Sequence, residues 1–282
     1  MTPRVFFITG TSTGFGKEYV NIALSQGNYV VATARNCSAL SFPDATDANC
    51  LRVNLDVTNK AAIDKAFDAA MNKFGHVDVV CNNAGYGLMG EFEAMSDEDI
   101  RQQMEVNFFG LVDVTRKAIQ IMREQKTGGV IQQVSSFGGR IGVPTGSMYN
   151  ASKFALEGFT EAVALEMKPE WNIKFTILEP GGFRTDWAGR SAQFPAKKHP
   201  AYDHVDGRAR MAARHGTQPG DPKKGAQAFY DLAVMENPPI RCLVGTDAFA
   251  LMKKKLAADE KLLVDFEKIS NSTDIDGYVP PS

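Results

Sequence analysis

Short apolar runs alternate with longer amphipathic stretches along most of this chain. The apolar runs cover residues 5–9, 29–34, 50–55, 77–81, 129–136, 173–178 and 241–245. Several of them are continuous, which is typical of strands buried on both faces of a parallel sheet. Helical spacing covers residues 18–24, 60–74, 96–125, 149–167, 223–235 and 247–269. The alternation predicts one doubly wound α/β domain, with a seven-stranded, mostly parallel sheet and helices on both faces.

Two segments near the C-terminus stand apart from this alternation. Residues 186–222 carry prolines, glycines and charges without a regular pattern, and we expect a lid or substrate loop over about 181–222. Its histidines, His199, His204 and His215, have no metal-ligand spacing. Residues from about 246 to 282 are expected to form a helical extension of a single domain that spans 1–282.

Composition excludes several function classes. The 282 residues include 31 basic and 33 acidic ones, so the net charge of −2 gives no basis for binding nucleic acid or an anionic membrane. No apolar run approaches the roughly 18 residues of a membrane span. The four cysteines are widely scattered, at Cys37, Cys50, Cys81 and Cys242. They form no metal or CxxC spacing, which favours a reduced, cytoplasmic protein without a metal site.

A glycine-rich loop follows the first apolar run. It reads Gly10-Thr11-Ser12-Thr13-Gly14-Phe15-Gly16 and leads into a helical pattern and a second strand. Strand, glycine loop, helix and strand form the context of a dinucleotide fingerprint. Glycines let the backbone approach a pyrophosphate, and the helix N-terminus faces its negative charge. The loop therefore predicts a nucleotide cofactor.

Tyr149 and Lys153 are four residues apart in a predicted helix. That spacing puts their side chains on one face, about 5–6 Å apart at Cβ. A lysine ammonium beside a phenol favours the phenolate. A tyrosine pKa of about 10 must fall by about three units, or about 4 kcal/mol, for proton exchange near neutral pH. The alternative is an ordinary surface pair.

Further motifs surround this pair. Thr9 precedes the glycine loop, Asn82-Asn83-Ala84-Gly85 follows the fourth strand, Ser136 lies thirteen residues before Tyr149, and Pro180-Gly181-Gly182-Phe183-Arg184-Thr185 follows the sixth strand. Together they resemble the short-chain dehydrogenase/reductase family over residues 5 to about 244. The residues after that are similar to its hydroxysteroid- and retinol-dehydrogenase-like branch.

The resemblance implies which residues hold the cofactor. Asp56 and Val57 would contact the adenine edge. Asn83, Ala84 and Gly85 would brace the sheet and the cofactor. The nicotinamide carboxamide would be held by Pro180, Gly181, Phe183 and Thr185, and its ribose by Tyr149 and Lys153.

The second strand ends in Arg35-Asn36, where NAD-binding folds usually place an acid. A guanidinium can pair with a 2′-phosphate, which favours NADP(H) over NAD(H), with Asn36 and Thr11 as helpers. The alternative is a surface arginine in a loop.

The resemblance also implies a reaction, the interconversion of a ketone or aldehyde with an alcohol. Tyr149 would donate the proton, Ser136 would polarise the carbonyl, and Lys153 would lower the Tyr149 pKa. Asn107 would accompany a helix kink and position a relay water. Dehydration or epimerisation on the same fold, and a non-catalytic cofactor-sensing protein, remain as alternatives.

Residues beside the motifs indicate a substrate and a partner. An apolar, mid-sized substrate fits the side chains of Tyr86, Leu88, Met89, Ile141, Met148, Phe183 and Trp187. Alternatively, Arg140 and Arg184 would receive an anionic group. Helices 97–125 and 149–167 form the dimer face in many members of the family, so a homodimer is expected. Gln132 and Gln133 are unusual for a buried strand and indicate a polar contact next to the site.

Overall fold

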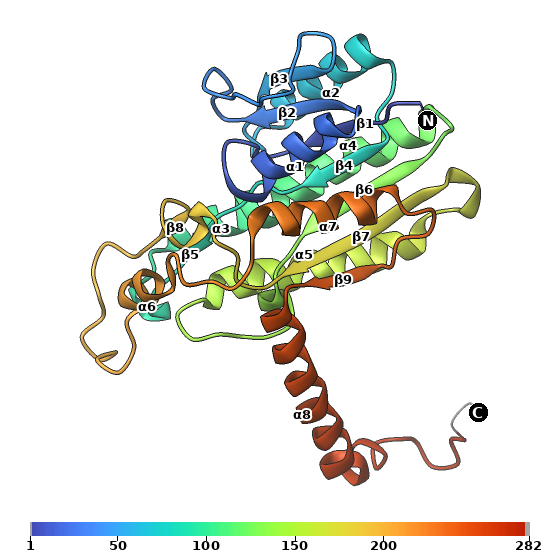
Figure 1. Cartoon of the computed structure of the whole chain (residues 1–282). Helices are drawn as coiled ribbons and strands as arrows, with labels where there is room; N and C mark the ends of the chain where they lie inside the picture. The colour runs from blue at the N-terminus through green and yellow to red at the C-terminus, as the bar shows by residue number, and fades with distance from the viewer. Residues whose placement is uncertain (1, 280–282) are drawn as a thin grey trace.

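The computed structural model describes residues 2–279 and is organised around one twisted sheet (Figure 1). Its strands are β1 (Val5–Ile8), β2 (Tyr29–Ala34), β3 (Cys50–Asn54), β4 (Val79–Asn82), β6 (Gly129–Val134), β7 (Ile173–Pro180) and β9 (Arg241–Val244). They lie in the order β3-β2-β1-β4-β6-β7-β9, and every neighbouring pair is parallel. The predicted doubly wound sheet is therefore confirmed, and it is wholly rather than mostly parallel.

Helices cover both faces of the sheet (Figure 1). On one face lie α1 (Gly14–Ser25) and α7 (Pro222–Val234), and on the other α2 (Lys60–Phe74), α4 (Gly110–Glu124) and α5 (Ser147–Glu166). Neighbouring residues of β1 face opposite layers: Phe6 packs with the first cluster, and Phe7 stacks on Phe67 of α2 at 4.1 Å. Both faces of β1 are buried, which explains its continuous apolar run.

The two glutamines of β6 connect these layers. Gln132 accepts a hydrogen bond from the Tyr19 hydroxyl at 2.7 Å and donates to the Phe229 carbonyl at 2.8 Å. Gln133 faces the other layer, where it accepts from the Asn82 amide at 2.9 Å and donates to the Thr115 hydroxyl at 3.0 Å. The predicted polar contact is thus a pair of cross-layer contacts, and both glutamine amides use their oxygen and their nitrogen in hydrogen bonds.

The helix predicted over residues 96–125 is not continuous. It divides into α3 (Asp97–Met104), a π-helical turn (Glu105–Phe109) and α4, and the turn directs Asn107 into the interior. The π-helical turn lies where the family resemblance implies a kink.

The segment expected to be irregular is also partly regular. It contains a 3₁₀ turn (Asp186–Ala188), β8 (Ala192–Gln193) and α6 (Gly207–Arg214). Strand β8 pairs in parallel with β5 (Gly87–Leu88), which was not predicted. Further 3₁₀ turns lie at Phe92–Ala94, Phe137–Gly139 and Pro169–Trp171.

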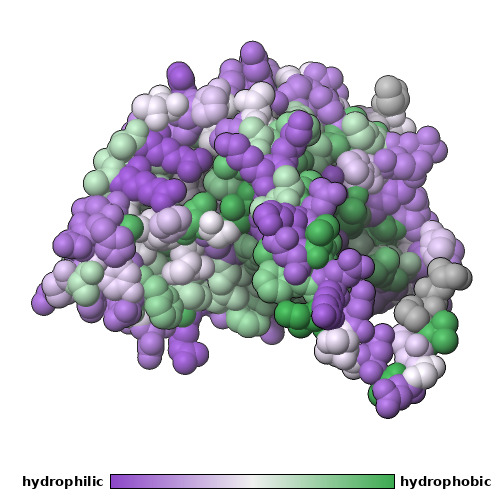
Figure 2. All heavy atoms as spheres, turned by 90° about the horizontal axis from the view of Figure 1, so that it is seen from below, coloured by the Kyte–Doolittle hydropathy of each residue, from purple (hydrophilic) through white to green (hydrophobic). Residues whose placement is uncertain are grey.

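The last helix, α8 (Thr246–Ser270), projects away from the body of the molecule (Figure 1). Ala248 and Met252 at its root are buried, whereas Leu262, Leu263 and Phe266 farther along are exposed. Seen from the side on which α8 projects, hydrophilic and apolar side chains are mixed over this segment (Figure 2). Between residues 2 and 279, no helix combines the length and the apolar character needed to cross a membrane.

Candidate active site

The glycine loop lies between the end of β1 and the start of α1. Gly10 and Gly14 have φ values of 69° and 56°, in the left-handed region that favours glycine. A Cβ atom on Gly16 would lie 2.6 Å from Asn83 Nδ2. Ser12 is exposed, and Phe15 packs against Phe183 with ring centroids 4.8 Å apart. The loop therefore presents backbone closely, as a phosphate-binding turn requires.

The end of β4 braces this loop. The Asn83 amide donates to the carbonyls of Thr9 and Gly10 at 2.9 and 3.0 Å. The backbone N–H groups of Asn83 and Ala84 donate to the Thr9 hydroxyl at 3.0 and 2.9 Å. These contacts join the carboxyl ends of β1 and β4, where the strand order reverses. A crevice at that position is the usual ligand site of doubly wound sheets.

The N-terminus of α1 offers backbone donors beside the loop. Its N-cap residue, Thr13, makes no side-chain capping bond. Instead, the Thr13 hydroxyl accepts a bond from Arg190 Nη2, which lies between the 3₁₀ turn at Asp186–Ala188 and β8, at 3.1 Å. Thr185 also approaches, because a Cβ on Gly14 would lie 3.4 Å from Thr185 Cβ. Arg190 is a cation at this site that the sequence patterns did not identify.

The residues predicted around the adenosine lie at the ends of β2 and β3. Arg35 and Asn36 are exposed, and the Asn36 side chain accepts bonds from Ser38. Thr11 is buried and its hydroxyl donates to the Thr33 carbonyl at 3.1 Å, so it braces the loop and does not face a 2′-phosphate. In the turn after β3, Asp56 is exposed and Val57 packs against Gly110.

The segment after β7 is held by α8. Asp247 Oδ2 accepts a bond from the Gly182 N–H at 2.7 Å, and its carboxylate also contacts Gly181. Phe183 is buried in the core cluster beneath the glycine loop, so its predicted role in a substrate pocket is wrong. The spacing of motifs gave no sign of Asp247, because it is distant in sequence from the segment it holds.

Ser136, Tyr149 and Lys153 meet where β6 ends against α5. All three side chains are buried. The Lys153 ammonium donates to the Val134 carbonyl at 2.8 Å and lies 5.8 Å from the centre of the Tyr149 ring. The Ser136 hydroxyl accepts a bond from the Gly138 N–H at 3.1 Å. A Cβ atom on Gly138 would lie 3.4 Å from the Ser136 hydroxyl and 3.5 Å from Cε1 of Tyr149, so the serine turn packs against the tyrosine ring. The structure thus assembles this predicted trio.

Burial dominates the protonation of the pair. It raises the pKa of Tyr149 to about 12, opposed by the Ser136 hydrogen bond and by the charge of Arg214. It lowers the pKa of Lys153 to about 8, opposed by the charge of Glu157. The expectation that Lys153 lowers the Tyr149 pKa is therefore not met in this structure, where the ammonium is bound to the Val134 carbonyl. Arg214, on α6, was not identified from the sequence.

Asn107 holds the chain beyond β4 in place. Its Oδ1 accepts from the Tyr86 N–H at 3.1 Å, and its Nδ2 donates to the Tyr86 carbonyl at 2.9 Å and the Ser152 hydroxyl at 3.2 Å. Ser152 in turn donates to the Tyr149 carbonyl at 2.7 Å. The π-helical turn thus ties Asn107 to the helix that carries Tyr149.

Apolar residues cover the tyrosine. Trp187 lies 5.1 Å from the Tyr149 ring, and Met89, Ala188 and Met211 complete the cluster. Leu88 is buried in the small β5–β8 sheet, and Ile141 and Met148 are half-buried.

The two arginines proposed for an anionic substrate have other partners. Arg140 lies 3.8 Å from the buried carboxylate of Glu179, and Arg184 Nε donates to the Gln218 carbonyl at 2.8 Å. Both guanidinium groups are thus engaged by partners within the protein. This favours an apolar substrate over an anionic one.

Comparison with known proteins agrees with this geometry. Residues 4–195 match the model of the short chain dehydrogenase family. An uncharacterised oxidoreductase of Schizosaccharomyces pombe is 40% identical over 98% of this chain and 93% of its own length. A 3-ketodihydrosphingosine reductase of Bacteroides thetaiotaomicron is 32% identical over 87% of this chain and 89% of its own.

A solved structure shows the same architecture. A short-chain dehydrogenase from Streptomyces avermitilis superposes with a TM-score of 0.86 at 34% identity, covering 97% of this chain and 100% of that one. A 3-ketoacyl-(acyl-carrier-protein) reductase of Brucella melitensis, solved with NADH, has a TM-score of 0.70 at 26% identity and covers 86% and 96%. With its glycine loop, braced β4 end and buried Ser–Tyr–Lys cluster, the chain belongs to the short-chain dehydrogenase family of oxidoreductases.

Proposed function

We propose that this protein interconverts a ketone or aldehyde with the corresponding alcohol, using NADP(H) as its cofactor. One observation carries the proposal: Ser136, Tyr149 and Lys153 are buried together, with the Lys153 ammonium 5.8 Å from the centre of the phenol ring and the serine turn packed against that ring. A packing role alone does not call for two hydroxyls and an ammonium buried together, because each loses hydration there.

The chain offers a fitting cradle for a dinucleotide. The close backbone approach at Gly10 and Gly16 and the uncapped N-terminus of α1 suit a pyrophosphate. Thr185 and Arg190 lie beside it. When bound, a nicotinamide cofactor supplies the hydride, and the protein supplies placement and electrostatics. The Brucella reductase solved with NADH supports a nucleotide of this class.

The proton chemistry follows from the buried hydroxyls. With a pKa of about 12, Tyr149 is a phenol at neutral pH and can donate its proton to the developing alkoxide. Ser136 donates a hydrogen bond to the same oxygen, where negative charge develops. Lys153 is proposed to hold the nicotinamide ribose, and Asn107 retains its proposed role in positioning a relay water.

Preference for NADP(H) is proposed from the end of β2. Arg35 is exposed there and no acid stands beside it in Ala34-Arg35-Asn36. A guanidinium matches the geometry of a phosphate, whereas an acid at this position would bind ribose hydroxyls. Of the two residues proposed to assist Arg35, Asn36 is exposed and Thr11 is buried.

The substrate is proposed to be apolar and mid-sized. Trp187, Met89 and Met211 form an apolar wall over Tyr149, and residues 181–222 would open and close as a lid. The Bacteroides relative is named as a reductase of a keto compound, 3-ketodihydrosphingosine, which is compatible with this class.

A homodimer and a cytoplasmic location complete the proposal. A groove is lined by Phe108 and Phe109 of the π-helical turn, by α4 and by Phe159 of α5, and Phe109 is 49% exposed. Aromatic side chains of this kind are enriched in protein interfaces. All four cysteines are free thiols, as is usual in a reducing compartment.

Replacing Tyr149 by phenylalanine tests the reaction. Turnover of a panel of apolar ketones and aldehydes with NADPH should fall by about 10²–10⁴-fold, because the proton donor is lost. Affinity for NADPH should stay near that of the wild type. The control is Tyr29→Phe, at the opposite end of the sheet, where β2 begins.

Residual activity within about tenfold of the wild type would contradict the role of Tyr149, since general acid catalysis contributes more than that. Products that are dehydrated or epimerised, with no net oxidation of the cofactor, would instead show a different reaction on the same fold.

A further inference from the structure

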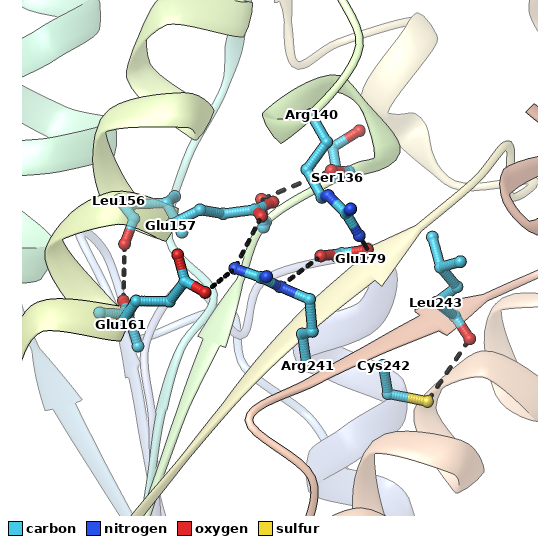
Figure 3. A network of polar contacts seen from close by, with 11 residues as sticks. Ser136, Arg140, Leu156, Glu157, Glu161, Glu179, Arg241, Cys242 and Leu243 are labelled. Carbon is cyan, nitrogen blue, oxygen red and sulfur yellow. Dashed lines mark hydrogen bonds and ion pairs between the residues drawn. The ribbon is translucent and has the colours of Figure 1, made fainter. Parts of the chain in front are cut away.

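A buried cluster of charges lies behind the candidate active site (Figure 3). Glu157 of α5 and Glu179 of β7 are 4% and 0% exposed. Arg241 of β9 lies between them, with Nε 3.2 Å from Glu179 and Nη2 3.8 Å from Glu157. Arg140, just beyond the Ser136 turn, approaches Glu179 at 3.8 Å. Side chains from four separate segments thus converge behind the catalytic serine.

Helix α5 is fastened to the end of β6 at two successive residues. The Lys153 ammonium donates to the Val134 carbonyl at 2.8 Å. One helical turn later, Glu157 Oε1 accepts from the Ser135 hydroxyl at 2.5 Å. Ser136 follows immediately in the chain. The pair of contacts therefore sets the distance between the helix that carries Tyr149 and the strand that carries the serine.

The turn after Ser136 rests on the same carboxyl group. A Cβ on Gly139 would lie 2.5 Å from the Ser135 hydroxyl and 2.9 Å from Cδ of Glu157. The Gly139 N–H donates to the Ser136 carbonyl at 2.8 Å, which closes the turn. The serine turn therefore packs directly against the Glu157 carboxyl group, and only glycine fits at position 139.

The negative charge of Glu157 needs an explanation beyond bracing. Glu157 Oε2 and both oxygens of Glu179 are buried without a hydrogen bond of good geometry. Their ion pairs with arginine therefore compensate only part of the cost of burial. A glutamine at position 157 could accept the Ser135 bond at lower cost. Unlike a glutamine amide, however, the Glu157 carboxylate places a negative charge near Lys153.

We propose that Glu157 is a positioning residue of the active site: through Ser135 it fixes the strand end that carries Ser136, and its negative charge favours the ammonium form of Lys153. The first part is a matter of packing and the second of electrostatics, so they can be tested separately. The consequences for turnover rest on the proposed oxidoreductase function, whereas the effect on Lys153 does not.

Polar and charged groups face Glu157 from each element packed against it. Ser135 does so from just beyond β6, Lys153 and Glu161 from its own helix, Glu179 from β7 and Arg241 from β9. Burial and the neighbouring charge of Glu179 raise the pKa of Glu157 to about 7, opposed by Ser135 and Arg241. Glu157 is thus mainly ionised above neutral pH, where Lys153 would otherwise lose its proton.

Glu157→Gln separates charge from packing, because glutamine is nearly the same size and still accepts from Ser135. The matched control is Glu161→Gln: Glu161 lies one turn farther along α5, 3.0 Å from the same Arg241, but its side chain is 50% exposed. In Glu157→Gln, the alkaline limb of the kcat profile should move to lower pH, and NADPH affinity should hold. In Glu161→Gln, both should stay at wild-type values.

Ser135→Ala tests the packing part in a second variant that keeps the charge. Its kcat should fall by about tenfold or more, as expected when a reacting group is misplaced. Its alkaline limb should stay where it is in the wild type. A Ser135→Ala enzyme with wild-type kcat would overturn the positioning of Ser136 through this contact.

A readout independent of turnover is the titration of Lys153 itself. Protein labelled with ¹³C-lysine reports each side-chain pKa by NMR, and Lys153→Met assigns the signal. The Lys153 pKa should be lower in Glu157→Gln than in the wild type or in Glu161→Gln. Equal values in all three would overturn the electrostatic part. If that shift occurs but the wild type turns over no carbonyl or alcohol, the proposed function fails and the effect on Lys153 stands.

Discussion

Replacing Gly16 by alanine adds one methyl group at the tightest point of the nucleotide cradle. Its Cβ would overlap the carbonyl oxygen of Gly10 and would lie 2.6 Å from Asn83 Nδ2, whereas ordinary contact begins at 3.4 Å. The Gly10 backbone must therefore move, and Asn83 must retreat by about 0.8 Å. Its amide holds the Thr9 and Gly10 carbonyls at 2.9 and 3.0 Å, so the retreat loosens the joint between β1 and β4.

The magnitude follows from what the loop does. Forcing a methyl group into a packed site costs about 1–3 kcal/mol of the free energy of unfolding. A hydrogen bond to a charged phosphate is worth about 1.5–3 kcal/mol. Losing one such bond from the displaced loop therefore raises the Kd for the nucleotide by about tenfold or more. NADPH and NADH should be affected alike, because both carry the pyrophosphate.

The assay is a fluorescence titration with each nucleotide, paired with unfolding in urea. Gly158→Ala is the control, since a Cβ at this exposed position of α5 would meet no atom within 4 Å. That variant should keep the wild-type Kd and gain about 0.5–1 kcal/mol of stability from the lost flexibility. Wild-type affinity of Gly16→Ala for both nucleotides would refute the interpretation of this loop as a phosphate cradle.

Two further predictions concern charge. Arg35→Gln should raise the Kd for NADPH by about tenfold or more, because only NADPH carries a 2′-phosphate. The Kd for NADH should change by less than about twofold. Equal changes in the two Kd values, measured by titration, would contradict the role of Arg35. For stability, the folded chain holds a proton on Glu157, with its pKa of about 7, that the unfolded chain releases near 4.5. The stability of the wild type relative to Glu157→Gln should therefore fall as pH rises between these values. Urea unfolding at about pH 5 and about pH 7.5 measures this difference, and one that is the same at both values would contradict the buried titration.

Structural elements that depend on the order of neighbouring residues were predictable from the sequence. The apolar runs gave every strand of the main sheet, and the spacing of Tyr149 and Lys153 gave their common helix face. The position of Ser136 followed from the family motif. In each case a few neighbouring residues carry enough information, because burial on both faces and helical periodicity are read directly from the order of side chains.

Contacts between distant segments were not predictable. Asp247 holds the Gly182 backbone across 65 residues, and Arg190 reaches Thr13 across 177. Nothing in the local pattern of either residue indicates its partner, because each partner lies far away along the chain. The Tyr149 pKa was also misjudged, because the sequence shows the nearby lysine but not the extent of burial.

The two glutamines of β6 have a consequence for the position of the serine along its strand. Neighbouring side chains of a strand face opposite sides, so sliding β6 by one residue would present each amide to the wrong helical layer. Tyr19 and Phe229 on one side, and Asn82 and Thr115 on the other, would then lose their partners. The buried hydrogen bonds of Gln132 and Gln133 thus fix the register of β6, and with it the position of Ser136 beyond the end of the strand. A change in the length of the loop that follows Ser136 would leave this position unchanged.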